Sequence, residues 1–280
     1  MGLGHADEES QLMPVVRVGF ENVGLAGVWA ANSQVPTLPA CHLGDGNRQK
    51  VWRSTGTGTS DWAGVNLCST GAPVDRVAWV TYNFTTCAFL GVEGDCTSAF
   101  NSGSLFATCF APWHAERSGV CFADLSARQT KKWWRFVVCD TGVDDGYYEV
   151  GVFALGRATC FRVDVAQDIR YAIVDPSLVE YAPAGSPKTY PRAAYATVDL
   201  PHRFLAEALV FDTGGGVQDV LRTGGRRGDM VLSVFTSAPA CSCAAVALNL
   251  YGRLEESPAF AYVYAGGLTW DVGLRFRESL

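Results

Sequence analysis

The chain has ten cysteines and four histidines, yet it contains no Cys-x-x-Cys pair, no His-x-x-x-His pair and no Gly-x-Ser-x-Gly elbow. Those spacings are the local signatures of zinc and redox sites and of hydrolase nucleophiles. Without them, the sequence points to no catalytic residue, no cofactor and no enzymatic activity. We expect the four histidines in ordinary loop or surface positions: His5, His42, His114 and His202.

Long apolar runs are also missing, and about 18 uninterrupted apolar residues are required to span a bilayer. The segment Met1 to Gln11 is polar and acidic, and it lacks the basic region and apolar stretch of a signal peptide. The net charge of −6 provides no basic surface for nucleic acid. We therefore expect a protein that folds in a cytoplasm, with no membrane span and no direct reading of nucleic acid.

What the chain does contain favours β-structure. Hydrophobic residues make up 48% of the 280 residues, aromatic residues 12%, and 30 glycines and 12 prolines are spread along the chain. Aromatic and β-branched residues favour strands, and frequent Gly and Pro favour turns between them. The sequence predicts a mainly β protein with little helix.

The cysteines are scattered singly through apolar segments, apart from Cys241 and Cys243. Free thiols that behave as small buried hydrophobes are the first interpretation. A metal or iron–sulfur site that includes Cys241 and Cys243, and oxidation at a late stage, are the alternatives.

The segment from Leu43 to Leu67 has the most informative pattern. A polar turn precedes a short strand, a Gly/Thr/Ser loop and a second apolar strand; the turn and its two tryptophans are Gly44, Asp45, Gly46, Asn47, Trp52 and Trp62. Glycine and asparagine allow the left-handed backbone of such a turn, and we expect both tryptophans to seal a core. This pattern resembles the opening of discoidin-like, galactose-binding-fold β-sandwiches.

Alternating or apolar segments predict further strands over 15–20, 74–82, 86–92, 132–139, 147–155, 192–200, 230–236, 244–254 and 269–277. The spacing over 204–211 predicts the one short helix. The expected organisation is an N-terminal arm over 1–14, a discoidin-like β-sandwich over 15–142 and a second antiparallel β-domain over 143–280. We expect the segments Met1–Pro14 and Ala182–Arg192 to extend as arms that reach a neighbouring subunit.

Three further segments carry a family resemblance. Asp140–Gly156, Leu248–Leu254 and Val77–Leu90 are similar to stretches of distal-tail or baseplate-type virion proteins from long-tailed bacteriophages and related gene-transfer particles. The residues that match are Gly146, Tyr147, Glu149, Gly151, Gly156, Tyr251 and Gly252, whereas Tyr82 stands where such proteins often carry histidine.

This resemblance implies a structural, tail-tube-like β-domain that joins a homo-oligomeric ring at the tail tip, with the sandwich decorating its outside. The implied partners are copies of the chain itself, the tail tube, the hub and the fibres. The implied location is the virion, assembled in the bacterial host cytoplasm.

Several motifs have an ordinary structural explanation beside a functional one. The turn residues Leu43, Asp45 and Asn47 offer oxygen ligands that suit calcium, but Asp45 capping its own turn is the simpler interpretation. Gly56–Ser60 resembles a phosphate loop but is expected to be a plain loop between strands. In Lys131–Arg135 we expect tryptophan inward and basic residues outward, rather than a nucleic-acid site.

Two other functions compete with the tail-tip hypothesis. The first is a carbohydrate-binding, receptor-binding or adhesion protein of the virion, which recognises a host surface glycan through exposed loop aromatics. The second is a hydrolase with an accessory sandwich, for which no motif in the sequence provides a catalytic group.

Overall fold

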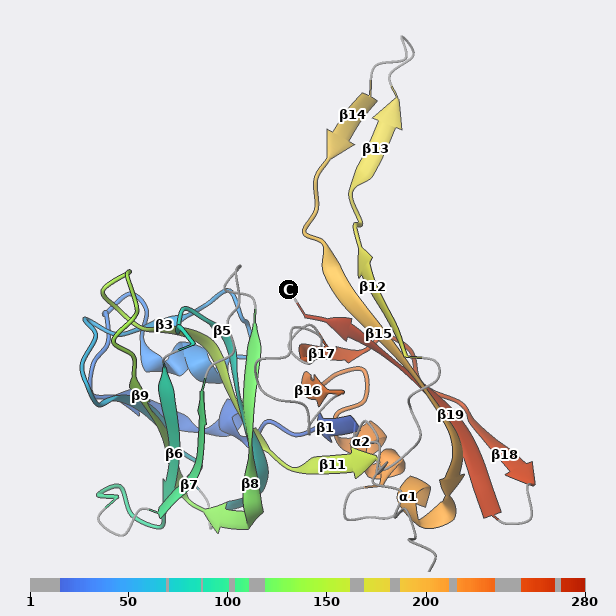
Figure 1. Cartoon of the computed structure of the whole chain (residues 1–280), viewed down its shortest axis with the longest axis horizontal. Coiled ribbons are helices and arrows are strands. Elements are labelled where there is room, and N and C mark those ends of the chain that lie inside the picture. The colour runs from blue at the N-terminus through green and yellow to red at the C-terminus, as the bar shows by residue number, and fades with distance from the viewer. Residues whose placement is uncertain are drawn as a thin grey trace, which may run out of the picture.

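The chain is mainly β. The computed structural model describes residues 16–68, 71–86, 88–100, 104–110, 119–161, 169–181, 187–211, 216–234, 248–264 and 268–279. In these ranges, antiparallel strands form a β-sandwich and a separate, larger sheet, with a hairpin that projects beyond both (Figure 1).

The sandwich consists of two antiparallel sheets. Within the described ranges its five-stranded sheet has the order β2-β4-β9-β6-β7, and its four-stranded sheet has the order β3-β10-β5-β8. The 3-10 turn η1 (Val23–Ala26) leads into its first strand, and the 3-10 turn η2 (Ala40–Gly44) lies between its first two strands. The strands are β2 (Val28–Ala31), β3 (Trp52–Arg53), β4 (Asp61–Asn66), β5 (Ala72–Tyr82), β6 (Phe89–Asp95), β7 (Ser104–Phe110), β8 (Val120–Lys131), β9 (Trp133–Cys139) and β10 (Glu149–Gly156).

Aromatic side chains fill the space between these two sheets. The Phe136 ring lies 5.6 Å from the Trp52 ring and 4.8 Å from the Phe153 ring, and Trp79 lies 5.5 Å from Phe153. Fully buried aromatic side chains bring large apolar areas together in edge-to-face contacts, which stabilises such a core beyond the area alone. The core prediction is right for Trp52 and wrong for Trp62, which lies half-buried on the outer face, near Arg135. Trp134 fills the core in its place.

The second sheet contains strands from both ends of the chain. Its order over the described residues is β11-β1-β16-β17-β19-β15-β12, with β18 also paired to β19. Two short helices, α1 (Glu207–Phe211) and α2 (Val217–Thr223), contribute Val210, Val217 and Val220 to its apolar core. The strands are β1 (Val16–Gly19), β11 (Ala158–Phe161), β12 (Arg170–Val174), β15 (Tyr195–Ala206), β16 (Met230–Ser233), β17 (Leu250–Leu254), β18 (Phe260–Tyr264) and β19 (Leu268–Glu278).

This topology differs from the expected division at residues 15 and 142. Strand β1 pairs with β11 and β16 of the second sheet, so the sandwich is inserted between two neighbouring strands of that sheet. Strand β10 belongs to the sandwich, where it pairs with β3 and β5. The predicted helix also differs, because β15 runs to Ala206 and only Glu207–Phe211 is helical, while the second helix α2 was not predicted. Strand pairing with β19 overrides the local helical spacing there.

The four-stranded sheet is the middle layer of the molecule. Val77 and Trp79 of β5 face the sandwich core, whereas Ala78 and Val80 pack with Val231 and Tyr251 of the second domain. Because both faces are covered, β5 has a continuous apolar run where a half-exposed strand would alternate. The two domains therefore pack directly against each other.

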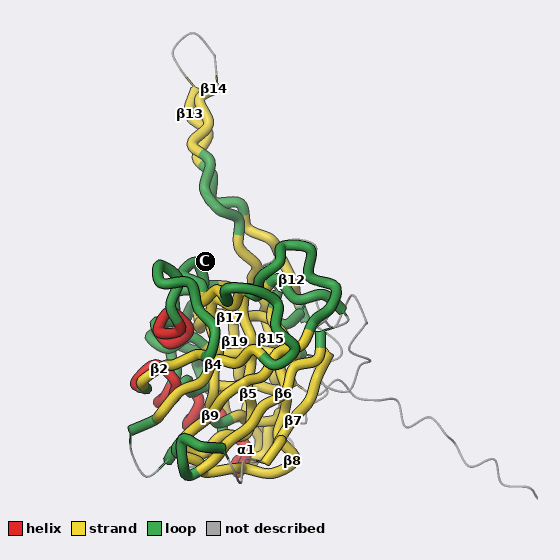
Figure 2. Tube along the Cα trace, turned by 90° about the vertical axis from the view of Figure 1, so that its left-hand side faces the viewer, coloured by secondary structure: helices red, strands yellow, loops and turns green. Residues whose placement is uncertain are grey.

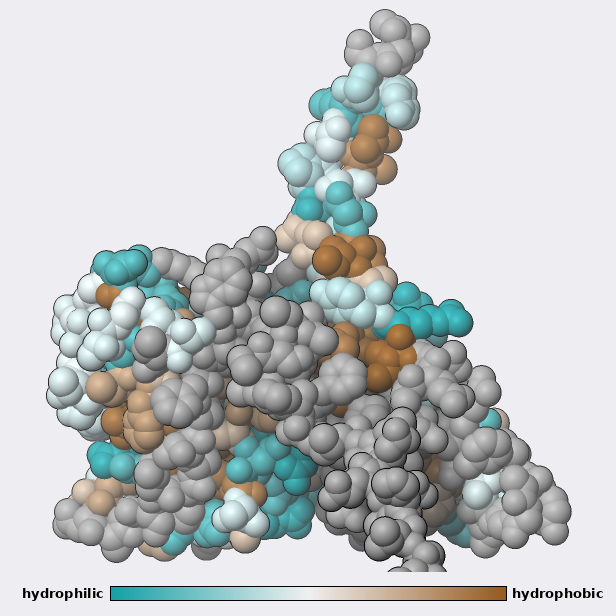
Figure 3. Space-filling model, viewed as in Figure 1, coloured by the Kyte–Doolittle hydropathy of each residue, from teal (hydrophilic) through white to brown (hydrophobic). Residues whose placement is uncertain are grey.

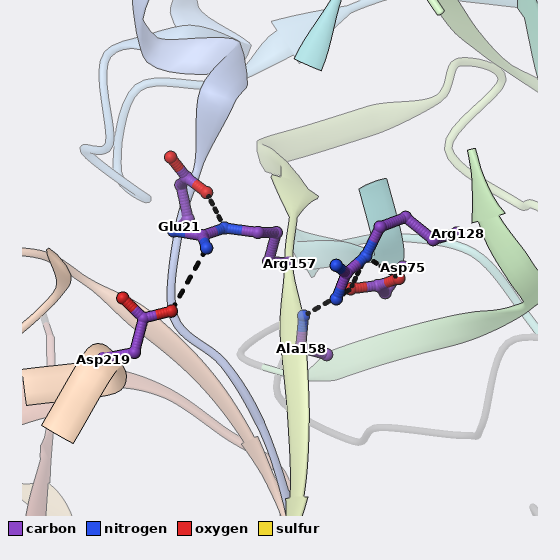
Figure 4. A network of polar contacts seen from close by, with 6 residues as sticks. All are labelled: Glu21, Asp75, Arg128, Arg157, Ala158 and Asp219. Carbon is purple, nitrogen blue, oxygen red and sulfur yellow. Dashed lines mark hydrogen bonds and ion pairs between the residues drawn. The ribbon is translucent and has the colours of Figure 1, made fainter. Parts of the chain in front are cut away.

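Ion pairs surround this junction. The Arg157 guanidinium donates through Nε to Glu21 at 2.7 Å and through Nη1 to Asp219 of α2 at 3.2 Å (Figure 4). Nearby, the Asp75 carboxylate accepts hydrogen bonds from Arg128 and from the Ala158 amide. These groups hold the sandwich to the second sheet where the chain passes from one domain to the other.

A two-stranded hairpin, which we call the arm, consists of β13 (Leu178–Tyr181) and β14 (Pro187–Tyr190). It extends from the β12–β15 end of the second sheet, away from the rest of the molecule (Figure 2). All eight of its described strand residues are exposed. Part of the predicted arm Ala182–Arg192 lies in this hairpin, whereas residues 182–186 and the predicted arm Met1–Pro14 lie outside the described residues.

The described cysteines only partly match their prediction. Among Cys41, Cys68, Cys96, Cys121 and Cys139, only Cys121 is buried, and the first three are exposed. Cys241 and Cys243 lie outside the described residues. In the part of the chain that the structure describes, none of the helices has the length and apolar character to cross a membrane.

Candidate functional site

A polar cluster with an aromatic ring lies beside β3 and β10 of the sandwich. Strand β3 positions Arg53, whose Nε donates to Glu149 Oε1 at 2.7 Å, and the register pairs the two residues directly. The Arg53 guanidinium lies 4.1 Å from the centre of the Tyr147 ring. The hydrogen bond to Glu149 raises the pKa of Arg53 further, so its charge is permanent.

Asn83 fixes the turn that carries Tyr147. Its Nδ2 donates to the Tyr147 carbonyl at 2.8 Å and to Asp145 at 3.2 Å, and its Oδ1 accepts from the Glu149 amide at 2.7 Å. Gly146 adopts φ +73, a left-handed conformation that glycine tolerates at no steric cost. The resulting surface combines a guanidinium, an aromatic ring and carboxylates, which are groups that bond hydroxyls and stack on apolar ring faces.

The resemblance identified Tyr147 and Glu149 but not their partners. Arg53 and Asn83 lie 96 and 66 residues away from Glu149 in the sequence, and strand pairing brings them to it. No local motif connects these residues, so the sequence provided no signal for the complete cluster.

The expected calcium turn is held by its own hydrogen bonds. Asp45 Oδ1 accepts from the Asn47 amide at 2.8 Å, and Oδ2 pairs with Lys50 Nζ at 2.9 Å. Gly46 supplies the left-handed position of this turn, with φ +75. A capped turn beside a lysine is what the simpler interpretation predicts, and calcium at Leu43, Asp45 and Asn47 stays a prediction.

The other expected groups have structural partners. Trp134 is buried and Arg135 pairs with Glu93 at 2.5 Å, as predicted for Lys131–Arg135. Trp133, however, is only half-buried and lies on the same face as Arg135, so the inward prediction is wrong for this tryptophan. The Gly56–Ser60 segment lies between strands β3 and β4, as expected.

The remaining resemblance residues belong to the packing between elements. A Cβ on Gly44 would lie 2.0 Å from the Trp29 indole nitrogen, and one on Gly151 would lie 2.5 Å from the Arg48 carbonyl. Gly156 and Gly252 are also crowded by backbone atoms. Tyr251 is buried at the junction, and this burial raises the pKa of its phenol.

The described histidines and acidic residues form no metal cluster. His42 Nδ1 lies 2.9 Å from the Val51 carbonyl, and the side chains of His5, His114 and His202 lie outside the described set. Within that set, no group of three or more His, Cys, Asp or Glu residues is placed to hold a metal ion.

The arm is a second candidate site, because large apolar side chains are exposed along it and at its base. Figure 3 shows hydrophobic residues on the projecting hairpin, above the body of the molecule. In the described part of the chain, the large apolar and aromatic side chains exposed on the arm and on β12 at its base are Tyr171 (43% exposed), Ile173 (68%), Leu178 (46%), Val179 (47%), Tyr181 (72%) and Tyr190 (38%).

Comparisons with known proteins find solved structures that are similar to about half of the chain. No family model matches the sequence, and no curated protein matches it. Similar solved structures include a chitosan-binding module of a chitosanase/glucanase from Paenibacillus sp. IK-5, with 18% identity, 49% of this chain and 99% of that chain covered, and a TM-score of 0.41. The family 32 CBM of NanJ from C. perfringens, solved with galactose, shows 15% identity, coverage of 50% and 99%, and a TM-score of 0.39.

A third similar structure is the CBM32 of AlyQ, solved with 4,5-unsaturated mannuronic acid, with 13% identity, coverage of 49% and 96%, and a TM-score of 0.37. The proteins named here are carbohydrate-binding modules, and none of them is named as a tail protein. At these identities and TM-scores the likeness assigns no ligand to this chain, and the mainly β class follows from the strands themselves.

Proposed function

We propose that this chain is a non-catalytic structural protein that assembles with copies of itself through its arm. The observation that supports this proposal is the arm itself, a hairpin that projects from the second sheet and exposes apolar side chains. We further propose that the assembly belongs to the tail tip of a tailed phage or phage-like particle.

The physical argument concerns the stability of the arm. An isolated two-stranded hairpin is at best marginally stable in water, because it buries too little apolar surface. Strands β13 and β14 pair only with each other in the described residues. Tyr181 and Val179 would lose their remaining contact with water if the hairpin docked on another subunit. Burial of apolar surface contributes roughly 25 cal/mol for each Å² removed from water.

The placement in a virion rests on the resemblance of three sequence segments to distal-tail proteins. In this proposal the second sheet and its arm form the ring that joins the tail tube to the baseplate or fibres. The sandwich is inserted into that sheet between β1 and β11, and in this proposal it lies on the outside of the ring.

Light scattering of the purified protein, with electron-microscope images of the same sample, tests the assembly. We expect closed rings or tubes with a mass that is a multiple of the 280-residue chain. A monodisperse monomer at high concentration would contradict the proposal.

A second candidate function is recognition of a host surface glycan by the sandwich. The cluster of Arg53, Tyr147 and Glu149 favours it, because a ring beside a charged hydrogen-bonding group suits a sugar. The similar structures named above are carbohydrate-binding modules, which agrees with this alternative more closely than with a tail-tip role.

Under this alternative, a glycan array should yield a hit whose affinity falls about tenfold in Tyr147→Ala. Titration calorimetry with the identified glycan measures this change. Tyr262→Ala removes an exposed tyrosine of the other domain and should leave the affinity unchanged. Equal affinities for all three proteins would show that the cluster is not the binding site.

A further inference from the structure

The two faces of the arm differ in charge. Residues paired directly across a hairpin share a face, so Val179 and Thr189 lie on the same side as Tyr181 and Pro187. This face carries no charged residue in β13 and β14. The opposite face carries Leu178, Tyr190 and the charged residues Glu180 and Lys188. The arm is therefore amphipathic, and its uncharged face is the one suited to burial.

An uncharged patch also lies at one edge of the sandwich. Leu25 of η1 is 51% exposed and Val28 of β2 is 63% exposed, the largest exposures among the large hydrophobic residues described outside the arm and its base. Strand β2 is the end strand of its sheet and pairs only with β4 in the part of the chain that the structure describes. Its sequence, Val-Trp-Ala-Ala, has none of the charges or prolines that usually protect an edge strand.

From these two surfaces we infer that the arm of one copy docks its uncharged face on the exposed Leu25 and Val28 side chains, the Leu25–Val28 patch, of the next copy. This inference rests on the proposed self-assembly and names the surface that receives the arm. The residues named on the arm's uncharged face, and Leu25 and Val28 themselves, carry no charge, so contact between these side chains desolvates no ion.

The contact joins two different surfaces, so each copy offers one of each. Such head-to-tail contacts propagate, and they close into a ring when the rotation between copies permits it. Every copy therefore presents one arm and one Leu25–Val28 patch. A single kind of contact between copies covers both surfaces.

Two charge insertions test this contact by analytical ultracentrifugation. We expect Tyr181→Lys on the arm and Val28→Lys on the patch each to weaken self-association at least about tenfold. Leu178→Lys makes the same kind of change on the opposite face of β13, and Phe89→Lys makes it on β6; both should assemble like the unmodified protein. All four positions are exposed, and circular dichroism confirms that each variant is folded.

A mixture of the two disrupted variants provides the decisive result. The Tyr181→Lys copy keeps an intact patch and the Val28→Lys copy keeps an intact arm, so the mixture should form one-to-one dimers and nothing larger. If Val28→Lys assembles normally while Tyr181→Lys does not, the arm docks elsewhere, and the inference is wrong although the proposed function stands. If the unmodified protein is monomeric, both are wrong.

Discussion

Replacement of Arg76 by methionine is expected to lower the free energy of unfolding by about 3 kcal/mol. Arg76 is almost fully buried at the junction of the two domains, where Nε donates to Asp124 at 2.7 Å and Nη1 donates to Ser233 at 2.8 Å. Methionine keeps the apolar stem but leaves Asp124 with Arg17 as its remaining ion-pair partner among those described here. Urea unfolding measures the loss.

The matched control is Arg128→Met, which removes an ion pair with Asp75 at the surface. The Arg128 side chain is 47% exposed, so this change should cost less than about 1 kcal/mol. If both variants lowered the free energy of unfolding by the same amount, burial of the Arg76 ion pair at the junction would add nothing to stability.

The ion pair between Arg76 and Asp124 makes the stability of the protein depend on pH. Burial alone would raise the pKa of Asp124, but the hydrogen bonds and charges of Arg76 and Arg17 outweigh it and hold the pKa below the ordinary value of an aspartate. The stabilisation is therefore complete above the unfolded pKa of about 4 and is lost as the pH falls through the lower folded pKa. The difference in stability between the unmodified protein and Arg76→Met should shrink below pH of about 4.

Replacement of Gly156 by alanine is expected to cost about 3 kcal/mol or more, because no space exists for the added methyl group. A Cβ at this position would lie 1.6 Å from the carbonyl oxygen of Glu21, in the segment that follows β1. Backbone crowds this site, so relief requires β10 and that segment to separate. Thermal unfolding of the purified variant measures the effect.

Gly273→Ala is the matched control, since a Cβ there has no neighbour within 4 Å. We expect its stability to stay within about 1 kcal/mol of the unmodified protein. If Gly156→Ala does not fold well enough to measure, Gly252→Ala provides a second case, with a Cβ contact of 2.0 Å to Arg277. Unchanged melting of both crowded variants would contradict the packing argument.

Strands with strong apolar patterns were predictable from the sequence. The segments expected over 74–82, 132–139 and 269–277 correspond to β5 (Ala72–Tyr82), β9 (Trp133–Cys139) and β19 (Leu268–Glu278). Strands β9 and β19 bury every second side chain, which leaves a period of two in the sequence, whereas β5 is covered on both faces and shows as a continuous apolar run. Both patterns are local. The short edge strand β2 has too few residues to show such a period, and it was missed.

The candidate sites were predictable only in part. Tyr147 and Glu149 stand in a segment that resembles tail proteins, and Ala182–Arg192 was expected to project. Arg53 reaches Tyr147 through pairing of β3 with β10, and no spacing in the sequence encodes that pairing. The difference in charge between the arm's two faces likewise required the register of β13 on β14.

The sequence by itself determined the class of this protein, because its aromatic residues, scattered glycines and alternating strands are local properties that tertiary contacts do not reverse. Tertiary structure alone decided that Val16–Gly19 leaves the sandwich and pairs with β11 and β16. It also decided which apolar residues stay in water, since Tyr171 and Ile173 of β12 and Val28 of β2 are exposed on strands that lie at the end of their sheets. Strand partners are chosen by contacts between distant parts of the chain, and a single sequence does not record those contacts.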